Sequence, residues 1–188
     1  AHRIIRGLER RDYLSRNEDT KRYSLGARIA YLGSLAENRS DDGLREKAYE
    51  YLVKIRDRIY ESASLYVRDG ASRICIDRVE SKQLLRWVIT VGERLPLPNG
   101  ATGKVLMSGM EDRELMELLG EDYEAVKPDV DKVRERGYWV SNGEREVGLS
   151  AIAAPVYNAK GKMIAAISIS GPTARIIDEE LAEKVQSV

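Results

Sequence analysis

Two serines near the end of an apolar run are the side chains of this sequence best placed to bind a ligand. Ser168 and Ser170 lie in the run 163–172, which follows a similar run at 150–157 across a Gly-containing turn. Two short apolar runs joined in this way predict an antiparallel hairpin, which we place at the centre of a sheet. Because side chains alternate along a strand, both hydroxyls share one face, among small residues that leave room for a polar ligand, unless they simply meet solvent. The opposite face is expected to be the core face, with Met163, Ala165, Ile167 and Ile169.

The loop GERLPLPNGATGK at 92–104 is a second candidate binding element. Its end is similar to a phosphate-binding loop, but that motif requires Gly where Pro98 stands and Ser or Thr where Val105 stands. What remains is a run of backbone N–H groups at the start of a helix, where the amides of 101–103 can receive a carboxylate or another anion. The alternative is an ordinary helix start with Lys104 in solvent.

Most catalytic chemistry lacks the side chains that it needs. The single histidine, His2, is at the N-terminal end, so neither a His-based triad nor a Cys/His zinc site can be built in the main domain. The single cysteine, Cys75, stands between two isoleucines, which favours a small core residue over a nucleophile. Glu144 and Glu146 lie in a polar loop, so a carboxylate-dyad hydrolase has no support. We therefore expect neither an enzyme nor a cofactor.

Charge is balanced over the 188 residues but unevenly placed. The chain has 31 Lys/Arg and 31 Asp/Glu, of which residues 1–28 hold eight and four, leaving 23 and 27 for the rest. The N-terminal segment is therefore about +4, which indicates contact with a polyanion there. One cysteine excludes an intrachain disulfide, and the sequence has neither a membrane-spanning apolar run nor a signal peptide. We expect a cytoplasmic protein with no membrane partner.

The elements expected around these residues form an antiparallel α+β domain with an N-terminal appendage. Helical spacing at 1–9 followed by strand-like runs at 13–16 and 22–25 is the order of a winged helix-turn-helix and its wing, although it also fits an ordinary hairpin. The chain starts inside this helix, so we expect a longer protein. Further on, helices are expected at 42–60, 102–107, 112–119, 129–136 and from 178, and strands at 64–68, 72–79, 84–91 and 138–140.

Five segments together resemble the IclR-type bacterial and archaeal transcription regulators, over nearly the whole chain. They are LERRDYL at 8–14 with RYSLG at 22–26, GERLPL at 92–97 leading to Gly103-Lys104, RERGY at 134–138, GLSAIAAP at 148–155 and AISISGP at 166–172. Any one of these segments is weak evidence, whereas five in the right order are strong evidence.

The resemblance implies the domain organisation and the partners. It implies the C-terminal part of a winged helix-turn-helix at 1–25, a linker helix at 26–39, and at 40–188 a GAF-like effector-binding domain with an antiparallel sheet flanked by helices. The main base-reading residues are expected before Ala1. Family members are homodimers or dimers of dimers that bind operator DNA. The residues expected to contact phosphate are Arg3, Arg6, Arg16 and Arg22.

The resemblance also implies a site for a small organic effector, a carboxylate or an aromatic compound, on the concave face of the sheet. By position, Ala101 and Thr102 are backbone donors and Ser168 and Ser170 are hydroxyl donors. The walls would be Leu84, Trp87 and Leu149, and the rim Ser141, Asn142 and Ala151.

Two positions depart from family members that bind small keto acids. Those members carry an acid where Ser141 stands and a cysteine where Ala151 stands, so the departure points to a different or larger effector. We therefore predict a ligand-responsive DNA-binding regulator. The alternatives are a GAF-like small-molecule enzyme that uses Cys75, or a dimerisation module without a ligand. For Trp87, ordinary core packing is the alternative to a place in the pocket wall.

Overall fold

The computed structural model describes residues 2–17, 20–26, 28–29 and 43–176 of the chain. They belong to two compact units, Ala1–Leu44 and Arg45–Val188. The predicted linker helix lies almost wholly outside the described residues, and the C-terminal helix expected from position 178 lies wholly outside them. The three domain boundaries inferred from the sequence stay predictions.

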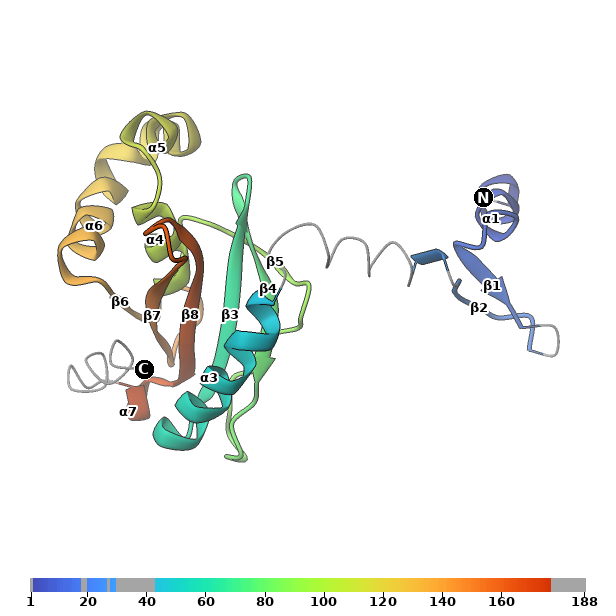
Figure 1. Ribbon diagram of the computed structural model, residues 1–188, viewed down its shortest axis with the longest axis horizontal. Helices are drawn as coiled ribbons and strands as arrows, with labels where there is room; N and C mark the ends of the chain where they lie inside the picture. The colour runs from blue at the N-terminus through green and yellow to red at the C-terminus, as the bar shows by residue number, and fades with distance from the viewer. Residues whose placement is uncertain (1, 18–19, 27, 30–42, 177–188) are drawn as a thin grey trace. The chain divides into compact units, whose positions relative to one another are not determined.

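The N-terminal unit is a helix followed by a two-stranded hairpin (Figure 1). Its elements are α1 (His2–Glu9), β1 (Leu14–Arg16) and β2 (Tyr23–Leu25), and β1 pairs antiparallel with β2. After the hairpin, the backbone at Gly26 lies very close to that at Asp12, since a Cβ on Gly26 would be only 2.1 Å from the carbonyl oxygen of Asp12. The helix and the hairpin expected from the sequence are confirmed.

The second unit is built on a six-stranded antiparallel sheet with helices on both faces (Figure 1). The strand order is β5-β4-β3-β8-β7-β6, so the hairpin of β7 and β8 is internal, as predicted. The strands are β3 (Ser62–Asp69), β4 (Ser72–Val79), β5 (Arg94–Pro96), β6 (Trp139–Asn142), β7 (Leu149–Tyr157) and β8 (Met163–Pro172). The helices are α3 (Leu44–Ile59), α4 (Ala101–Ser108), α5 (Asp112–Leu119), α6 (Tyr123–Arg136) and α7 (Thr173–Ile176). The predicted α+β class is confirmed.

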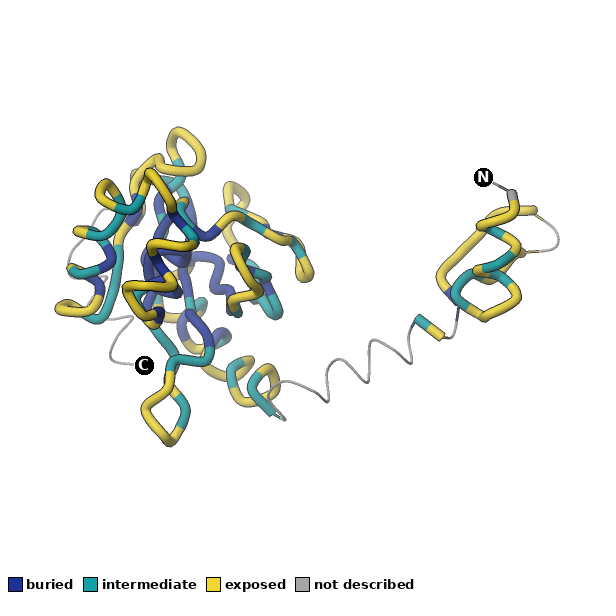
Figure 2. Tube along the Cα trace, turned by 90° about the horizontal axis from the view of Figure 1, so that it is seen from above, coloured by how far each residue is buried: buried dark blue, intermediate teal, exposed yellow. Residues whose placement is uncertain are grey.

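One face of the sheet is covered by α4, which packs on β6, β7 and β8, with α6 packed on α4 and α5 on α6. The buried side chains between these layers form one apolar cluster, and Figure 2 shows the buried residues gathered in the interior of this unit. The sheet contributes Tyr66, Cys75, Ala153 and Ala166, and the helices contribute Val105, Leu106, Met107, Leu115, Val130 and Val133. Burial of this area provides the main driving force for folding of the unit.

The opposite face holds a second group of buried residues and one buried ion pair. The apolar members include Leu52, Ile55, Ala63, Leu65, Ile152, Ile169 and Ile176. Glu61 is only 2% exposed, and its carboxylate pairs with the guanidinium of Arg175, with Nη2 at 3.2 Å from Oε2. Gly171 makes room for this pair, because a Cβ there would lie 2.3 Å from the Glu61 carboxylate.

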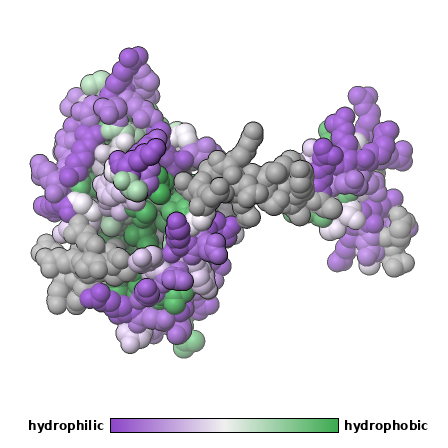
Figure 3. Space-filling view, viewed as in Figure 1, coloured by the Kyte–Doolittle hydropathy of each residue, from purple (hydrophilic) through white to green (hydrophobic). Residues whose placement is uncertain are grey.

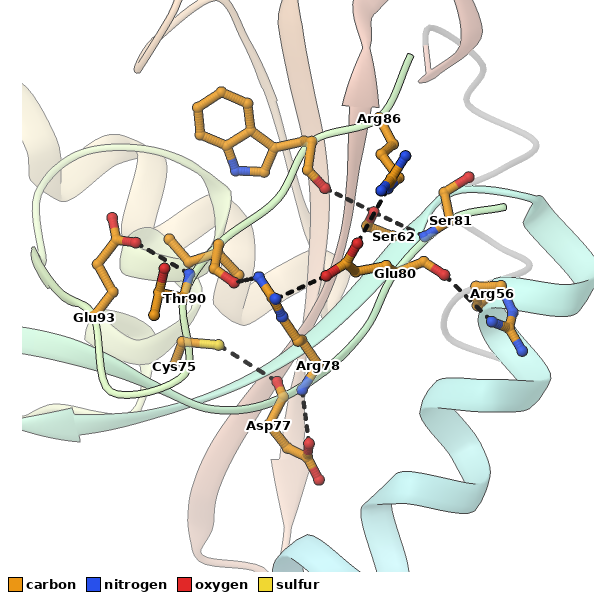
Figure 4. A network of polar contacts seen from close by, with 12 residues as sticks. Arg56, Ser62, Cys75, Asp77, Arg78, Glu80, Ser81, Arg86, Thr90 and Glu93 are labelled. Atoms are coloured by element: carbon orange, nitrogen blue, oxygen red, sulfur yellow. Dashed lines mark hydrogen bonds and ion pairs between the residues drawn. The ribbon is translucent and has the colours of Figure 1, made fainter. Parts of the chain in front are cut away.

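The strand predicted at 84–91 does not form. Its carbonyl groups bond to side chains instead of to a neighbouring strand: Ser62 Oγ donates to Trp87 O at 2.7 Å, and Arg78 donates to Ile89 O. The Arg78 guanidinium is held in turn by Glu80, as Figure 4 shows. The edge of β4 is taken by β5. Strand propensity was therefore outweighed by side-chain hydrogen bonds that the sequence does not reveal.

Two further sequence-based assignments are corrected by local irregularities. Met163 packs with the α4 cluster and not on the opposite face, because a β-bulge near the start of β8 places it opposite Tyr157 and shifts the alternation. The helix expected from 129 begins at Tyr123 and contains Pro128, whose missing N–H costs the helix one hydrogen bond. Its end at Gly137, in the left-handed conformation, is as expected.

We predict that Arg175→Ala lowers the free energy of unfolding by about 3 kcal/mol, because it leaves the Glu61 carboxylate buried and unpaired. The matched control is Arg113→Ala, which removes an exposed pair with Glu117 and should cost less than about 0.5 kcal/mol. Urea unfolding followed by circular dichroism measures both. Equal losses in the two variants would contradict the assigned role of the buried pair.

Candidate functional site

Four serine hydroxyls lie in two rows on the α4 face of the sheet. The register of β3 with β8 sets Ser62 opposite Ser170 and Ser64 opposite Ser168. Residues directly opposite each other in an antiparallel pair share a face, so the rows follow from the pairing. All four serines are buried, with Ser168 3% and Ser170 6% exposed. The two predicted serines therefore do not meet solvent.

Small residues continue the row of Ser62 and Ser170 across β7 and β6, whereas the row of Ser64 and Ser168 continues through Ala153 to Trp139. Ser170 stands opposite Ala151, and Ala151 stands opposite Ser141, which is itself buried. Leu149 precedes Ala151 by two residues and is half-buried on the same side. Hydroxyls set among small side chains suit a polar ligand that enters between the sheet and its helical cover.

The first turn of α4 sits unusually close to the loop that leads into it. Ala101 and Thr102, the predicted backbone donors, are buried there. A Cβ on Gly103 would lie 1.6 Å from the carbonyl oxygen of Leu97 and 2.8 Å from Nη1 of Arg73. Only glycine permits this approach, so Gly103 determines where the helix N-terminus stands above the sheet.

A carboxylate of the protein itself occupies the start of α4. Glu144 Oε2 accepts hydrogen bonds from Gly100 N at 3.1 Å and from Lys104 Nζ at 2.9 Å, and Oε1 accepts one from Trp139 Nε1 at 3.3 Å. Lys104 also pairs with Asp129 at 3.1 Å and is only 8% exposed. The alternative of Lys104 in solvent is thus wrong. A carboxylate thus lies at the start of this helix, but it belongs to the protein itself and bonds to the Gly100 amide and not to the predicted amides of 101–103.

The irregular segment after β4 and the loop after β6 meet beside the site. Arg145 lies over the ring of Trp87, 5.1 Å from its centroid, and pairs with Glu93 at 3.1 Å. Trp87 is half-buried, and its ring is in contact with the guanidinium of Arg145.

Two of the predicted site residues do not face this site. Leu84 is 99% exposed, since the segment that carries it is not a strand and turns its side chain outward. Asn142 follows Ser141 in β6 and therefore points to the other face, where its Oδ1 accepts a hydrogen bond from Ser150 at 3.1 Å.

Comparison with known proteins decides which family this arrangement belongs to. Residues 38–188 match the family model described as "Bacterial transcriptional regulator IclR C-terminal". The chain belongs to the IclR family. It is 32% identical to the HTH-type transcriptional regulator KdgR of Escherichia coli, over 98% of this chain and 74% of KdgR, and 31% identical to XynR of the same organism, over 96% and 76%. The crystal structure of an IclR transcriptional regulator from Alicyclobacillus acidocaldarius superposes with a TM-score of 0.80 at 28% identity, covering 99% of this chain and 78% of that one.

Family membership confirms three of the sequence-based inferences. The chain is a transcriptional regulator of the IclR type and not an enzyme, and its second unit has the α+β, GAF-like architecture of IclR effector domains.

Among the described residues, no helix is long and apolar enough to cross a bilayer.

Several residues of the candidate site were not foreseen from the sequence. Ser62 and Ser64 join the predicted serines only through the pairing of β3 with β8, which are far apart in the chain. Tyr66 is 4% exposed on the same face, and burial raises the pKa of its phenol, so it stays protonated. Arg73 and Glu144 flank the first turn of α4. The alternation of polar and apolar residues along 62–66 was the one sequence signal for these residues, but it does not show which face of the sheet holds the site.

Cys75 was the candidate nucleophile of the enzyme alternative, and its surroundings suit a core residue. The thiol is buried in the apolar cluster, and burial raises its pKa to about 11, from 9.0 for a free thiol. The thiolate is the reactive form, so its fraction near pH 8 falls by roughly 100-fold.

We predict that iodoacetamide at pH 8 alkylates Cys75 at least about 100-fold more slowly in the folded chain than in the same chain in urea, because burial both raises the pKa and blocks access. Mass spectrometry of timed samples gives both rates, and the single cysteine makes the assignment unambiguous. A native rate within tenfold of the denatured one would contradict a buried thiol.

Proposed function

We propose that this chain is a ligand-responsive transcriptional regulator in which the second unit binds a small organic carboxylate or aromatic acid and thereby controls DNA binding. The observation that carries the proposal is the pair of buried serine rows beside a helix N-terminus that already binds a carboxylate. Two of these hydroxyls have partners within the protein, because Ser62 donates to Trp87 O at 2.7 Å and Ser168 donates to Ile169 O at 3.3 Å. A polar ligand would take over the hydrogen bond that Ser168 donates.

The ligand would lie between the sheet and the first turn of α4. Ser168 and Ser170 would bond its polar atoms, with Ser141 and Ala151 at the rim and Leu149 and Trp87 against its apolar part. The names of the relatives support regulation but do not identify an effector for this chain.

The N-terminal unit would contact DNA phosphate through Arg3, Arg6, Arg16 and Arg22. All four side chains are exposed, and Figure 3 shows mostly hydrophilic residues on the described surface of this unit. Arg16 stands on β1 of the hairpin that resembles a wing. Guanidinium groups on an exposed hairpin match the geometry of phosphate recognition.

Effector binding would act through assembly of two or four chains. The segment 84–91 exposes several apolar side chains, including Leu84 (99%), Leu85 (68%) and Val88 (45%). Clustered exposed apolar residues often mark contact surfaces, which supports a homodimer or dimer of dimers. A ligand that binds one arrangement of the dimer better would shift the spacing of its two DNA-reading units. As a regulator of transcription, the protein would work in the cytoplasm.

We predict that Ser168→Ala combined with Ser170→Ala weakens effector binding by tenfold or more, because each hydroxyl lost removes a hydrogen bond to a polar ligand. A panel of small aliphatic and aromatic carboxylic acids is screened by thermal unfolding, and the acid that raises Tm most is titrated calorimetrically. The matched control is Ser150→Ala on the opposite face, which should keep wild-type affinity. Unchanged affinity in the double variant would remove the serines from the site.

We predict that binding to a mixed-sequence DNA duplex strengthens as salt is lowered, and that Arg16→Ala with Arg22→Ala reduces the slope of log affinity against log salt by roughly 2. For each arginine removed from a phosphate contact, binding releases about one counterion fewer from the DNA. Fluorescence anisotropy over a salt series measures the slope, with Arg113→Ala in the second unit as control. An unchanged slope in the double variant would exclude these two arginines from the phosphate contact.

A further inference from the structure

Arg73, on β4, is a buried cation with no anionic partner among the residues that the structure describes. It is 4% exposed, and Nη1 donates to the carbonyl oxygens of Pro96, at 2.5 Å, and Leu97, at 3.4 Å. Its Nε is buried and has no hydrogen-bond partner. Burial lowers the pKa of Arg73 to about 10, so the group is still charged at neutral pH.

The guanidinium of Arg73 lies directly against the first turn of α4. Nη2 is 3.6 Å from the position of a Cβ on Gly100, and Nη1 is 2.8 Å from that of a Cβ on Gly103. Two sources of positive potential therefore converge at one place, the helix N-terminus and an unneutralised guanidinium. A buried charge in this state is costly unless an anion completes it.

Charges around this turn leave one cation in excess even with Glu144 present. Among the described residues, Lys104 is paired with both Glu144 and Asp129, Lys132 with Asp129 at 3.6 Å, and Arg145 with Glu93, which leaves Arg73 without an ion pair. The Glu144 carboxylate already accepts from the Gly100 amide and Lys104 Nζ, so an incoming anion obtains these donors by replacing it. Such an anion could also reach the free Nε of Arg73.

Glu144 is attached in a way that allows it to leave. Its side chain is 28% exposed, and its loop lies between Gly143 and Gly148, both with positive φ and nothing within 4 Å of a Cβ position. The neighbouring Arg145 contacts Trp87 and Glu93. A movement of this loop would therefore change the contacts of the 84–93 segment.

We infer that the Glu144 carboxylate is an internal occupant of an anion subsite formed by Arg73, Lys104 and the Gly100 amide, and that the effector's carboxylate displaces it. The inference rests on the proposed function and narrows the ligand to a compound with a carboxylate, excluding neutral sugars and amides. Displacement releases the 143–148 loop from α4, so that binding of the ligand changes the contacts of the helix that covers the site.

Acetate and acetamide are the probes, since they have the same shape and differ in charge. Both are titrated into the full chain at constant ionic strength, with 15N-labelled tryptophan. Trp139 Nε1 donates to Glu144, so its indole N–H resonance reports directly whether that carboxylate has left. The chain has only two tryptophans, which allows assignment by substitution.

We expect acetate, but not acetamide, to move the Trp139 indole resonance toward its position in Glu144→Gln. Glu144→Gln should bind acetate at least tenfold more tightly, because the charged competitor is gone, and Arg73→Gln should lose acetate binding. The controls are Glu146→Gln in the same loop and Arg94→Gln on β5, where the arginine pairs with Asp69; both should titrate as wild type.

The inference is overturned if Glu144→Gln binds acetate no more tightly than wild type, or if acetamide acts as acetate does. Should Arg73→Gln fail to fold, the Glu144→Gln titration decides alone. If acetate binds equally well to wild type and Glu144→Gln while binding of the screened effector still depends on Ser168 and Ser170, the proposed function stands and this inference fails. If Glu144→Gln behaves as expected but no acid alters DNA binding, the subsite stands and the proposed function fails.

Discussion

The antiparallel pairing of β3 with β8 is the constraint on which the second unit depends. These strands are separated by about a hundred residues of sequence, and every element between them must be arranged so that Ser62 and Ser64 arrive opposite Ser170 and Ser168. A slip of β8 by one residue would turn Ser168 and Ser170 to the other face and bring Ile167 and Ile169 into their place. The same register therefore determines the apolar core on one side and the polar rows on the other.

The two faces of the sheet treat buried polar groups differently. On one face, Glu61 and Arg175 neutralise each other in an ion pair that contributes to stability and leaves no free charge there for a ligand. On the other, hydroxyls, a phenol and a partly unsatisfied guanidinium are gathered under α4. Polar groups of this kind lower stability compared with apolar packing, which supports a functional role for this face. Gly103 makes the arrangement possible, because it lets α4 approach the loop below it.

The division of labour between the two units follows from charge and burial. The N-terminal unit is basic, exposed and small, and suits a polyanion. The second unit has a core of its own and holds its polar groups inside. The IclR relatives share both parts, since they match nearly all of this chain, and the chain covers about three quarters of their length.

Sequence alone determined the features that depend on local order. Alternation and turn residues predicted the central hairpin and the shared face of Ser168 and Ser170, and the apolar neighbours of Cys75 predicted its burial, because these patterns act between adjacent residues. Tertiary structure decided the rest: the 84–91 segment is held by side chains from β3 and β4, a bulge reverses Met163, and pairing with β7 extends β6 as far as Asn142. It alone brought Arg73 and Glu144 to the start of α4, since no local pattern records which distant side chains will meet. Contacts between residues far apart in the chain depend on register and packing, and these are properties of the whole fold.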